Sequence, residues 1–137
     1  MNAGKERYVL DSFAVLAYLQ AEPGAEQVRS ILERTAAGES ETAMALINLD
    51  EVLYTTERTR NLEAAQMVVA LIDSLPVGQY AGTRALTLRA AHYKACHRMS
   101  YADCFAAALA VELGAHLVTG DPEFRSVEGE IPVVWLP

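Results

Sequence analysis

The feature that most constrains this chain is its alternation of short apolar segments with longer segments of helical composition. We expect strands at 7–10, 42–46, 77–80, 115–120 and 131–137. Helices are expected at 12–20, 25–37, 61–75, 83–97 and 100–113, with a further helix that follows the second strand and runs to about Arg58. This alternation predicts an α/β fold with a parallel sheet covered on both faces, and a helical insertion in the middle of the chain.

The composition is that of an ordinary globular domain, and we expect a single domain over residues 1–137. The chain is 52% hydrophobic and 21% charged. Its apolar stretches are shorter than a membrane span, and the opening MNAGKERYVL lacks the apolar core of a signal peptide. The two cysteines, Cys96 and Cys104, have neither metal-site spacing nor a disulfide framework. These features predict a cytoplasmic protein without a membrane partner.

The net charge of −7 argues against a protein that coats nucleic acid by charge alone. An acidic enzyme can still act on a nucleic acid if its negative charge is concentrated where cations bind. The charge balance therefore permits a metal site without requiring one.

Four acidic residues stand near predicted junctions between strands and helices: Asp11, Glu51, Asp103 and Asp121. Each has a structural explanation. Asp11 and Asp121 could cap the helices that follow them, and Asp121 precedes a first-turn proline. The segments Asn48-x-x-Glu51 and Ser100-x-x-Asp103 resemble capping boxes.

A second explanation is that the fold gathers these four acids at one place. In a parallel α/β sheet, the carboxyl ends of the strands and the amino ends of the following helices share an edge. Clustered carboxylates repel by roughly 4 kcal/mol per close pair at an effective dielectric constant of 20. A hard divalent cation, Mg²⁺ or Mn²⁺, offsets this repulsion, since such ions prefer oxygen ligands.

Four segments together resemble PIN-domain ribonucleases, and in particular the VapC-like toxins of type II toxin–antitoxin systems: YVLDSFAVLAYL, INLDEVLY, MSYADCFAAALA and LVTGDPEF. They occur in the family's order between about Tyr8 and Trp135. The resemblance implies a three-layer α/β/α domain with a short central parallel sheet of about four or five strands. It also implies a metal-dependent endoribonuclease that hydrolyses RNA phosphodiester bonds with Mg²⁺ or Mn²⁺.

The resemblance assigns catalytic and metal-binding roles to the four acids, and supporting roles to the hydroxyls of Ser12 and Thr119. Asp11 and Asp103 are expected to ligate directly, whereas Glu51 would ligate or orient the attacking water. Asp50 should point about 100° away from Glu51 on a helix and is expected at the surface. Ala45 stands where the family often has a small hydroxyl residue.

Basic residues follow the Glu51 helix and precede the Asp103 helix, and Arg98, Arg84 and Arg58 are the candidates for binding RNA. Arg98 is favoured because it is close to Asp103 in the sequence. The alternative is a solvated helix face, on which such residues are normally found.

The resemblance further implies a cognate antitoxin as partner, and the apolar helices predict a homodimer and a groove for an antitoxin segment. The main alternative is a catalytically silent PIN-like protein-binding module that keeps the acids for capping or for a partner's arginines. Two phosphoryl-transfer classes fit poorly. A haloacid-type phosphatase needs a second Asp where Phe13 stands, and a receiver domain needs a lysine beyond Lys94, where none occurs.

Overall fold

Five parallel strands form the centre of the molecule. The structure is a computed structural model and describes residues 4–137. The strands are β1 (Glu6–Leu10), β2 (Ser40–Ala45), β3 (Gly78–Tyr80), β4 (His116–Thr119) and β5 (Val133–Trp135). Their order is β3-β2-β1-β4-β5, and every neighbouring pair is parallel. The predicted parallel sheet is therefore confirmed.

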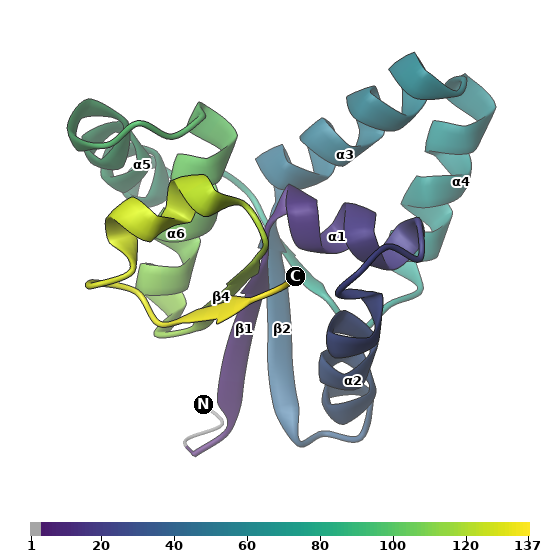
Figure 1. Cartoon of the computed structure of the whole chain (residues 1–137), viewed down its shortest axis with the longest axis horizontal. Coiled ribbons are helices and arrows are strands. Elements are labelled where there is room, and N and C mark those ends of the chain that lie inside the picture. The colour runs from purple at the N-terminus through teal and green to yellow at the C-terminus, as the bar shows by residue number, and fades with distance from the viewer. Residues whose placement is uncertain (1–3) are drawn as a thin grey trace.

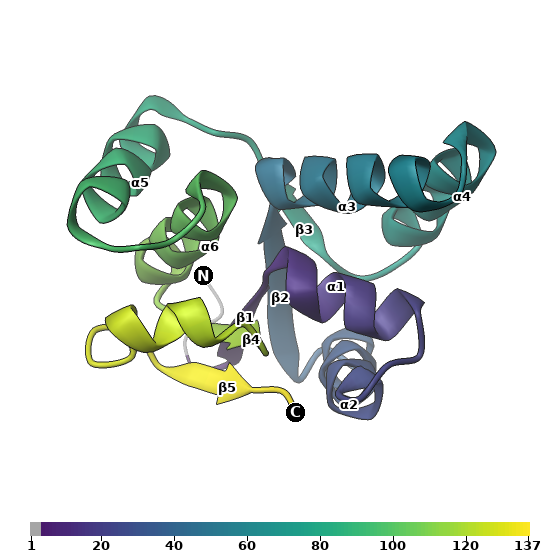
Figure 2. The ribbon, with the colours of Figure 1, turned by 45° about the horizontal axis from the view of Figure 1, so that its top comes forward.

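Helices cover both faces of this sheet, which confirms the three-layer α/β/α prediction (Figures 1 and 2). One side carries α1 (Ser12–Leu19), α2 (Ala25–Ala36), α3 (Leu46–Thr59) and α4 (Leu62–Asp73). The other side carries α5 (Arg84–Cys96), α6 (Tyr101–Leu113) and a short 3₁₀ helix, η1 (Pro122–Val127). The consecutive pairs α3–α4 and α5–α6 are the helical insertions between strands. Within residues 4–137, no helix combines the length and the apolar character needed to cross a bilayer.

Alternate residues of the strands supply the two halves of the core. Val9 of β1 packs with Leu117 of β4 on the side of α5 and α6, where the Ala-rich face of α6 is fully buried. Leu10 and Val118 point the other way, toward α1 and α2. This period of two is what a strand buried on both faces requires.

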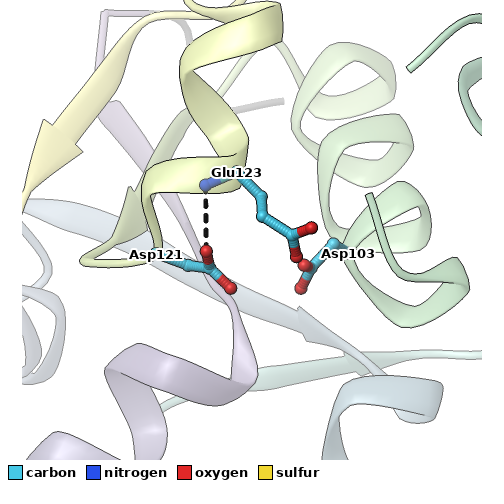
Figure 3. A group of neighbouring side chains, drawn as sticks. All are labelled: Asp103, Asp121 and Glu123. Atoms are coloured by element: carbon cyan, nitrogen blue, oxygen red, sulfur yellow. Dashed lines mark hydrogen bonds between the residues drawn. The ribbon is translucent and has the colours of Figure 1, made fainter. Parts of the chain in front are cut away.

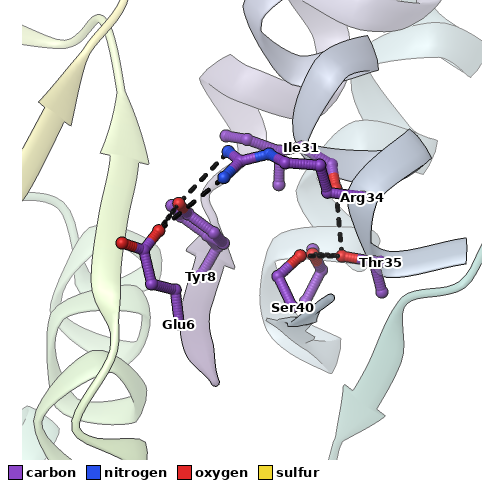
Figure 4. A network of polar contacts seen from close by, with 7 residues as sticks. Glu6, Tyr8, Ile31, Arg34, Thr35 and Ser40 are labelled. Atoms are coloured by element: carbon purple, nitrogen blue, oxygen red, sulfur yellow. Dashed lines mark hydrogen bonds and ion pairs between the residues drawn. The ribbon is translucent and has the colours of Figure 1, made fainter. Parts of the chain in front are cut away.

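A network of polar contacts at the amino ends of the strands fixes α2 against the sheet (Figure 4). The Tyr8 hydroxyl donates to Glu6 and accepts from the Arg34 guanidinium at 3.2 Å. Thr35 lies 2.8 Å from the Ser40 hydroxyl and donates to the Ile31 carbonyl at 3.0 Å. These contacts join β1, α2 and β2 at the amino ends of the strands, opposite the carboxyl-end edge that carries Asp11 and Asp121.

Helix starts agree with the capping signals in the sequence at α6 and differ at α3. The Ser100 hydroxyl accepts from the Asp103 amide at 3.1 Å, as a capping box predicts. The capping-box interpretation of Asn48-x-x-Glu51 is wrong, because α3 already begins at Leu46 and its N-cap is Ala45. The methyl group of Ala45 cannot accept a hydrogen bond from the first turn, so α3 lacks a side-chain cap.

The strand order contains a topological switch point between β1 and β4. Strands β2 and β3 are added on one side of β1, and β4 and β5 on the other. At such a switch point the following helices diverge to opposite faces and leave a crevice beyond the carboxyl ends of the strands.

Candidate metal centre

A pocket of about 270 Å³ opens at this switch point, and all four acids predicted from the sequence line it. A fifth acid, Glu123, lines it as well. No lysine, arginine or histidine is among the lining residues within the described part of the chain. These residues are Asp11, Ser12, Phe13, Leu16, Glu51, Thr55, Ser100, Asp103, Asp121 and Glu123.

Three of the carboxylates form a compact group: Asp103, Asp121 and Glu123 (Figure 3). One oxygen from each lies within 4.8 Å of the others. Asp103 comes from the first turn of α6, and the other two flank Pro122 at the start of η1. The Asp121 carboxylate accepts from the Glu123 amide at 2.9 Å, which caps η1 and fixes the two acids relative to each other.

Glu123 was not among the site residues predicted from the sequence. The available signal was the spacing Asp121-Pro-Glu123, since a proline after an N-cap begins a helical turn that brings the next acid back toward the cap.

Asp11 is held at the carboxyl end of β1 by two hydrogen bonds. One oxygen accepts from the Ala14 amide at 2.8 Å and caps α1, while the other accepts from the Thr119 hydroxyl at 2.5 Å. The Thr119 oxygen in turn accepts from the Asp121 amide at 3.0 Å. Thr119, predicted as a supporting residue, thus joins Asp11 to the Asp121 loop across neighbouring strands.

Ser12 and Asn48 connect Glu51 to the starts of α1 and α6 through hydrogen bonds. The Ser12 hydroxyl donates to the Glu51 carboxylate and accepts from the Asn48 amide at 3.3 Å. Asn48 also donates to the carbonyl of Ala102 at 3.1 Å and is completely buried. Asn48 therefore links α3, the start of α1 and the start of α6, a role that its sequence position did not reveal.

Burial dominates the electrostatics of the pocket. It raises the pKa of Asp11 to about 8, although the hydrogen bonds from Thr119 and Ala14 act in the opposite direction. Burial, and next the charge of Asp121, raise the pKa of Asp103 to about 7. Both carboxyl groups therefore hold protons at a higher pH than usual, as expected for acids that are buried away from water and have other acids as neighbours.

The donor set fits a hard divalent cation. The pocket offers five carboxylates and three hydroxyl-bearing neighbours, with no thiol or imidazole among its lining residues in the described chain. Asp11 and Asp121 serve as helix caps as well as lining the pocket, so the capping and metal-site interpretations are compatible.

The basic residues predicted to bind RNA lie outside the pocket lining. Arg58, Arg84 and Arg98 are exposed, and the Arg58 guanidinium lies 5.2 Å from the centre of the Tyr54 ring. Their contact with RNA remains a prediction. Asp50 is exposed and does not line the pocket, in agreement with the surface position expected for it.

Comparison with known proteins identifies the fold. The chain is similar to a Rickettsia felis VapBC2 structure bound to promoter DNA, with 17% identity and a TM-score of 0.76 over 96% of this chain and 99% of that one. It is also similar to Mycobacterium tuberculosis VapC20, a sarcin–ricin loop cleaving toxin, with 19% identity and a TM-score of 0.67 over 88% and 94% of the two chains. A DNA-bound VapBC from Salmonella typhimurium gives 18% identity and a TM-score of 0.73 over 94% and 97%.

No curated protein matches the sequence. The profile of the PIN domain matches residues 8–130, which include all five acids of the pocket and most of the single domain predicted over 1–137. The match covers far more than half of the chain, which therefore belongs to the PIN domain family.

Proposed function

We propose that this protein is a metal-dependent endoribonuclease and the toxin of a toxin–antitoxin pair. The observation that carries the proposal is the pocket at the switch point, where five carboxylates meet without a basic residue among the described lining. Such a concentration of negative charge would repel an RNA phosphate unless a cation stood between them. The similarity to VapC20, described as a toxin that cleaves the sarcin–ricin loop, supports RNA as the substrate.

The residues that would hold Mg²⁺ or Mn²⁺ are Asp11, Asp103 and Asp121, with Glu51 and Glu123 as further carboxylates of the pocket. When bound, the cation supplies Lewis-acid stabilisation of the phosphate charge and lowers the pKa of water.

The surrounding residues orient these carboxylates. Thr119 holds one oxygen of Asp11, and Ser12 holds Glu51. Glu51, half-buried at the pocket wall, is the candidate for orienting the attacking water. Arg98, Arg84 and Arg58 are proposed to contact RNA phosphates outside the pocket, and the affinity should then fall linearly with salt on a log–log plot.

The test is cleavage of RNA by the purified protein with Mn²⁺ or Mg²⁺, and with EDTA as the metal-free control. Asp11→Asn and Asp103→Asn should each lower the rate by about 100-fold or more, because each removes a charge from the metal-binding set. Asp50→Asn is the matched control, since Asp50 is adjacent to Glu51 but exposed and outside the pocket lining. Equal rates for all three variants would contradict the proposal.

The alternative of a silent binding module has its own outcome in the same experiment. A protein whose melting temperature does not respond to Mn²⁺, and which cleaves no RNA, would be such a module. RNA cleavage by the wild type, together with metal-dependent stabilisation that is lost in Asp103→Asn and kept in Asp50→Asn, would exclude it.

An antitoxin is the proposed protein partner, and its proposed binding place is a groove of about 340 Å³ between α1, α3 and α4. Its lining is mostly apolar, with Met67 68% exposed and Leu71 46% exposed. Large apolar side chains exposed around a groove are typical of a site for a partner helix or extended segment. Met67→Asp should escape neutralisation by the antitoxin while retaining RNA cleavage, whereas Leu88→Asp, exposed on α5, should remain neutralised.

A homodimer is also proposed, because exposed apolar side chains remain on several helices, Leu46 and Leu62 among them. Size-exclusion chromatography with light scattering at micromolar concentration should give twice the mass of 14.9 kDa. A strictly monomeric elution would refute the dimer.

A further inference from the structure

One wall of the acidic pocket is apolar. Phe13 and Leu16, on the first turns of α1, line the same pocket as the five carboxylates. Phe13 is 38% exposed although it immediately follows the buried pair Asp11 and Ser12. A water-exposed phenyl ring beside five carboxylates offers no ligand to a hard cation, so Phe13 serves some other purpose in this pocket.

The ring is held by a close approach to Gly120. A Cβ atom placed on Gly120 would lie 2.2 Å from one ring carbon of Phe13 and 2.5 Å from another. The backbone of Gly120 does not adopt the left-handed conformation that favours glycine, so the phenyl ring is what excludes a side chain at this position. Gly120 stands between Thr119 and Asp121, and the ring therefore rests against the loop that carries part of the acidic set.

The combination matches the two parts of a nucleotide. The carboxylates serve the phosphate through a cation, while a ring with an exposed surface can take a nucleobase. Stacking of a base on an aromatic side chain tolerates any base, because every base has a π face.

We propose that Phe13 is a nucleobase-stacking residue that binds the base next to the scissile phosphate. This inference rests on the proposed ribonuclease function. Because the base contact is made on binding, Phe13 contributes to KM, whereas the carboxylates determine kcat and metal affinity. Gly120 is a positioning residue, which keeps the ring against the loop.

The first test compares variants on a short oligoribonucleotide that the wild type cleaves at one mapped bond. Phe13→Leu keeps the apolar volume but removes the π face, and it should raise KM by about 5- to 100-fold with kcat and Mn²⁺ affinity nearly unchanged. Phe13→Trp should retain the wild-type KM. Gly120→Ala should raise KM as Phe13→Leu does, because the ring must turn away from the new methyl group.

Tyr80→Ala is the matched control, since Tyr80 is an aromatic residue 41% exposed outside the lining of the acidic pocket. It should leave KM unchanged. A Phe13→Leu variant with lowered kcat and weakened Mn²⁺ binding would instead show a role in supporting the carboxylates and would overturn the stacking proposal.

The second test removes the base rather than the ring. Oligoribonucleotides with an abasic site on either side of the mapped bond should bind the wild type more weakly at one of the two positions. Phe13→Leu should be insensitive to that same abasic site, because its stacking contact is already gone. Equal sensitivity of the two proteins would refute the proposal. Absence of cleavage by the wild type would instead refute the ribonuclease function itself, so the two failures are distinguishable.

Discussion

Replacement of Asp103 by asparagine should stabilise the metal-free protein at alkaline pH while abolishing the proposed activity. Asp103 is only 6% exposed, and its carboxyl faces the charge of Asp121. Asparagine keeps the shape and one acceptor oxygen but removes the charge. The same side chain is thus expected to cost stability and to support function, as is common in active sites.

The direction of this stability change follows from the pKa of Asp103, which is raised to about 7 from the value of 3.8 for an ordinary aspartate. The folded protein keeps the Asp103 proton at pH values where the unfolded chain has lost it. The contribution to the free energy of unfolding is therefore complete below pH 3.8 and is lost as the pH rises through about 7. Between pH 5 and that pKa, the free energy of unfolding falls by roughly 1.4 kcal/mol per pH unit. Screening by water in the open pocket reduces the total loss between pH 5 and pH 8 to ~2 kcal/mol.

Urea denaturation in EDTA at pH 5 and pH 8 measures this difference directly. The stability of Asp103→Asn relative to the wild type should increase by about 2 kcal/mol between the two pH values. Asp50→Asn, exposed on α3, should show no comparable change. Saturating Mn²⁺ should reverse the order, because only the wild type gains binding energy. A loss of more than about 1 kcal/mol in Asp103→Asn at pH 8 would mean that the carboxylate supports the fold, and the reasoning would be refuted.

Three further outcomes are expected. The affinity for Mn²⁺ should rise between pH 6 and pH 8, because the raised pKa values of Asp11 and Asp103 oppose binding at the lower pH. Calorimetry in buffers of different ionisation enthalpy measures both this affinity and the protons released on binding. An affinity that stays constant with pH would contradict the prediction. Asn48→Ala should cost about 1–3 kcal/mol in urea denaturation and weaken Mn²⁺ binding, because the Ala102 carbonyl and Ser12 lose their donor; wild-type values for both would remove Asn48 from the site. Ala45→Ser should raise stability by about 0.5–1 kcal/mol in thermal denaturation, because it supplies the cap that α3 lacks, and a destabilised variant would show that this buried position excludes a hydroxyl.

The elements of the fold were predictable because their signals are local. Thr83 and Ser100 cap α5 and α6, and Gly114 ends α6 in the left-handed conformation with φ of 61°. The gathering of the four acids was also predictable, since parallel strands bring their carboxyl ends to one edge whatever the intervening chain.

What escaped prediction depends on contacts between distant segments or on exact boundaries. Asn48 was interpreted as a helix start because Ala45, the actual N-cap, carries no capping group. Its bond to Ala102 joins residues 54 positions apart, for which a single sequence has no signal. The approach of Phe13 to Gly120 is equally remote, and neither residue alone suggests the other.

Asp11 and Asp121 line the pocket and also cap a helix, each with one carboxylate oxygen. Selection for the fold therefore acts on these two residues in addition to any selection for the function of the pocket. A descendant that had lost the proposed activity would still be selected to keep these two aspartates, because its helices need them. Glu51 and Glu123, which cap no helix in the described chain, would then be free to drift. Among diverged sequences of this fold, Glu51 and Glu123 rather than Asp11 and Asp121 should therefore distinguish members that keep the proposed activity from members that have lost it.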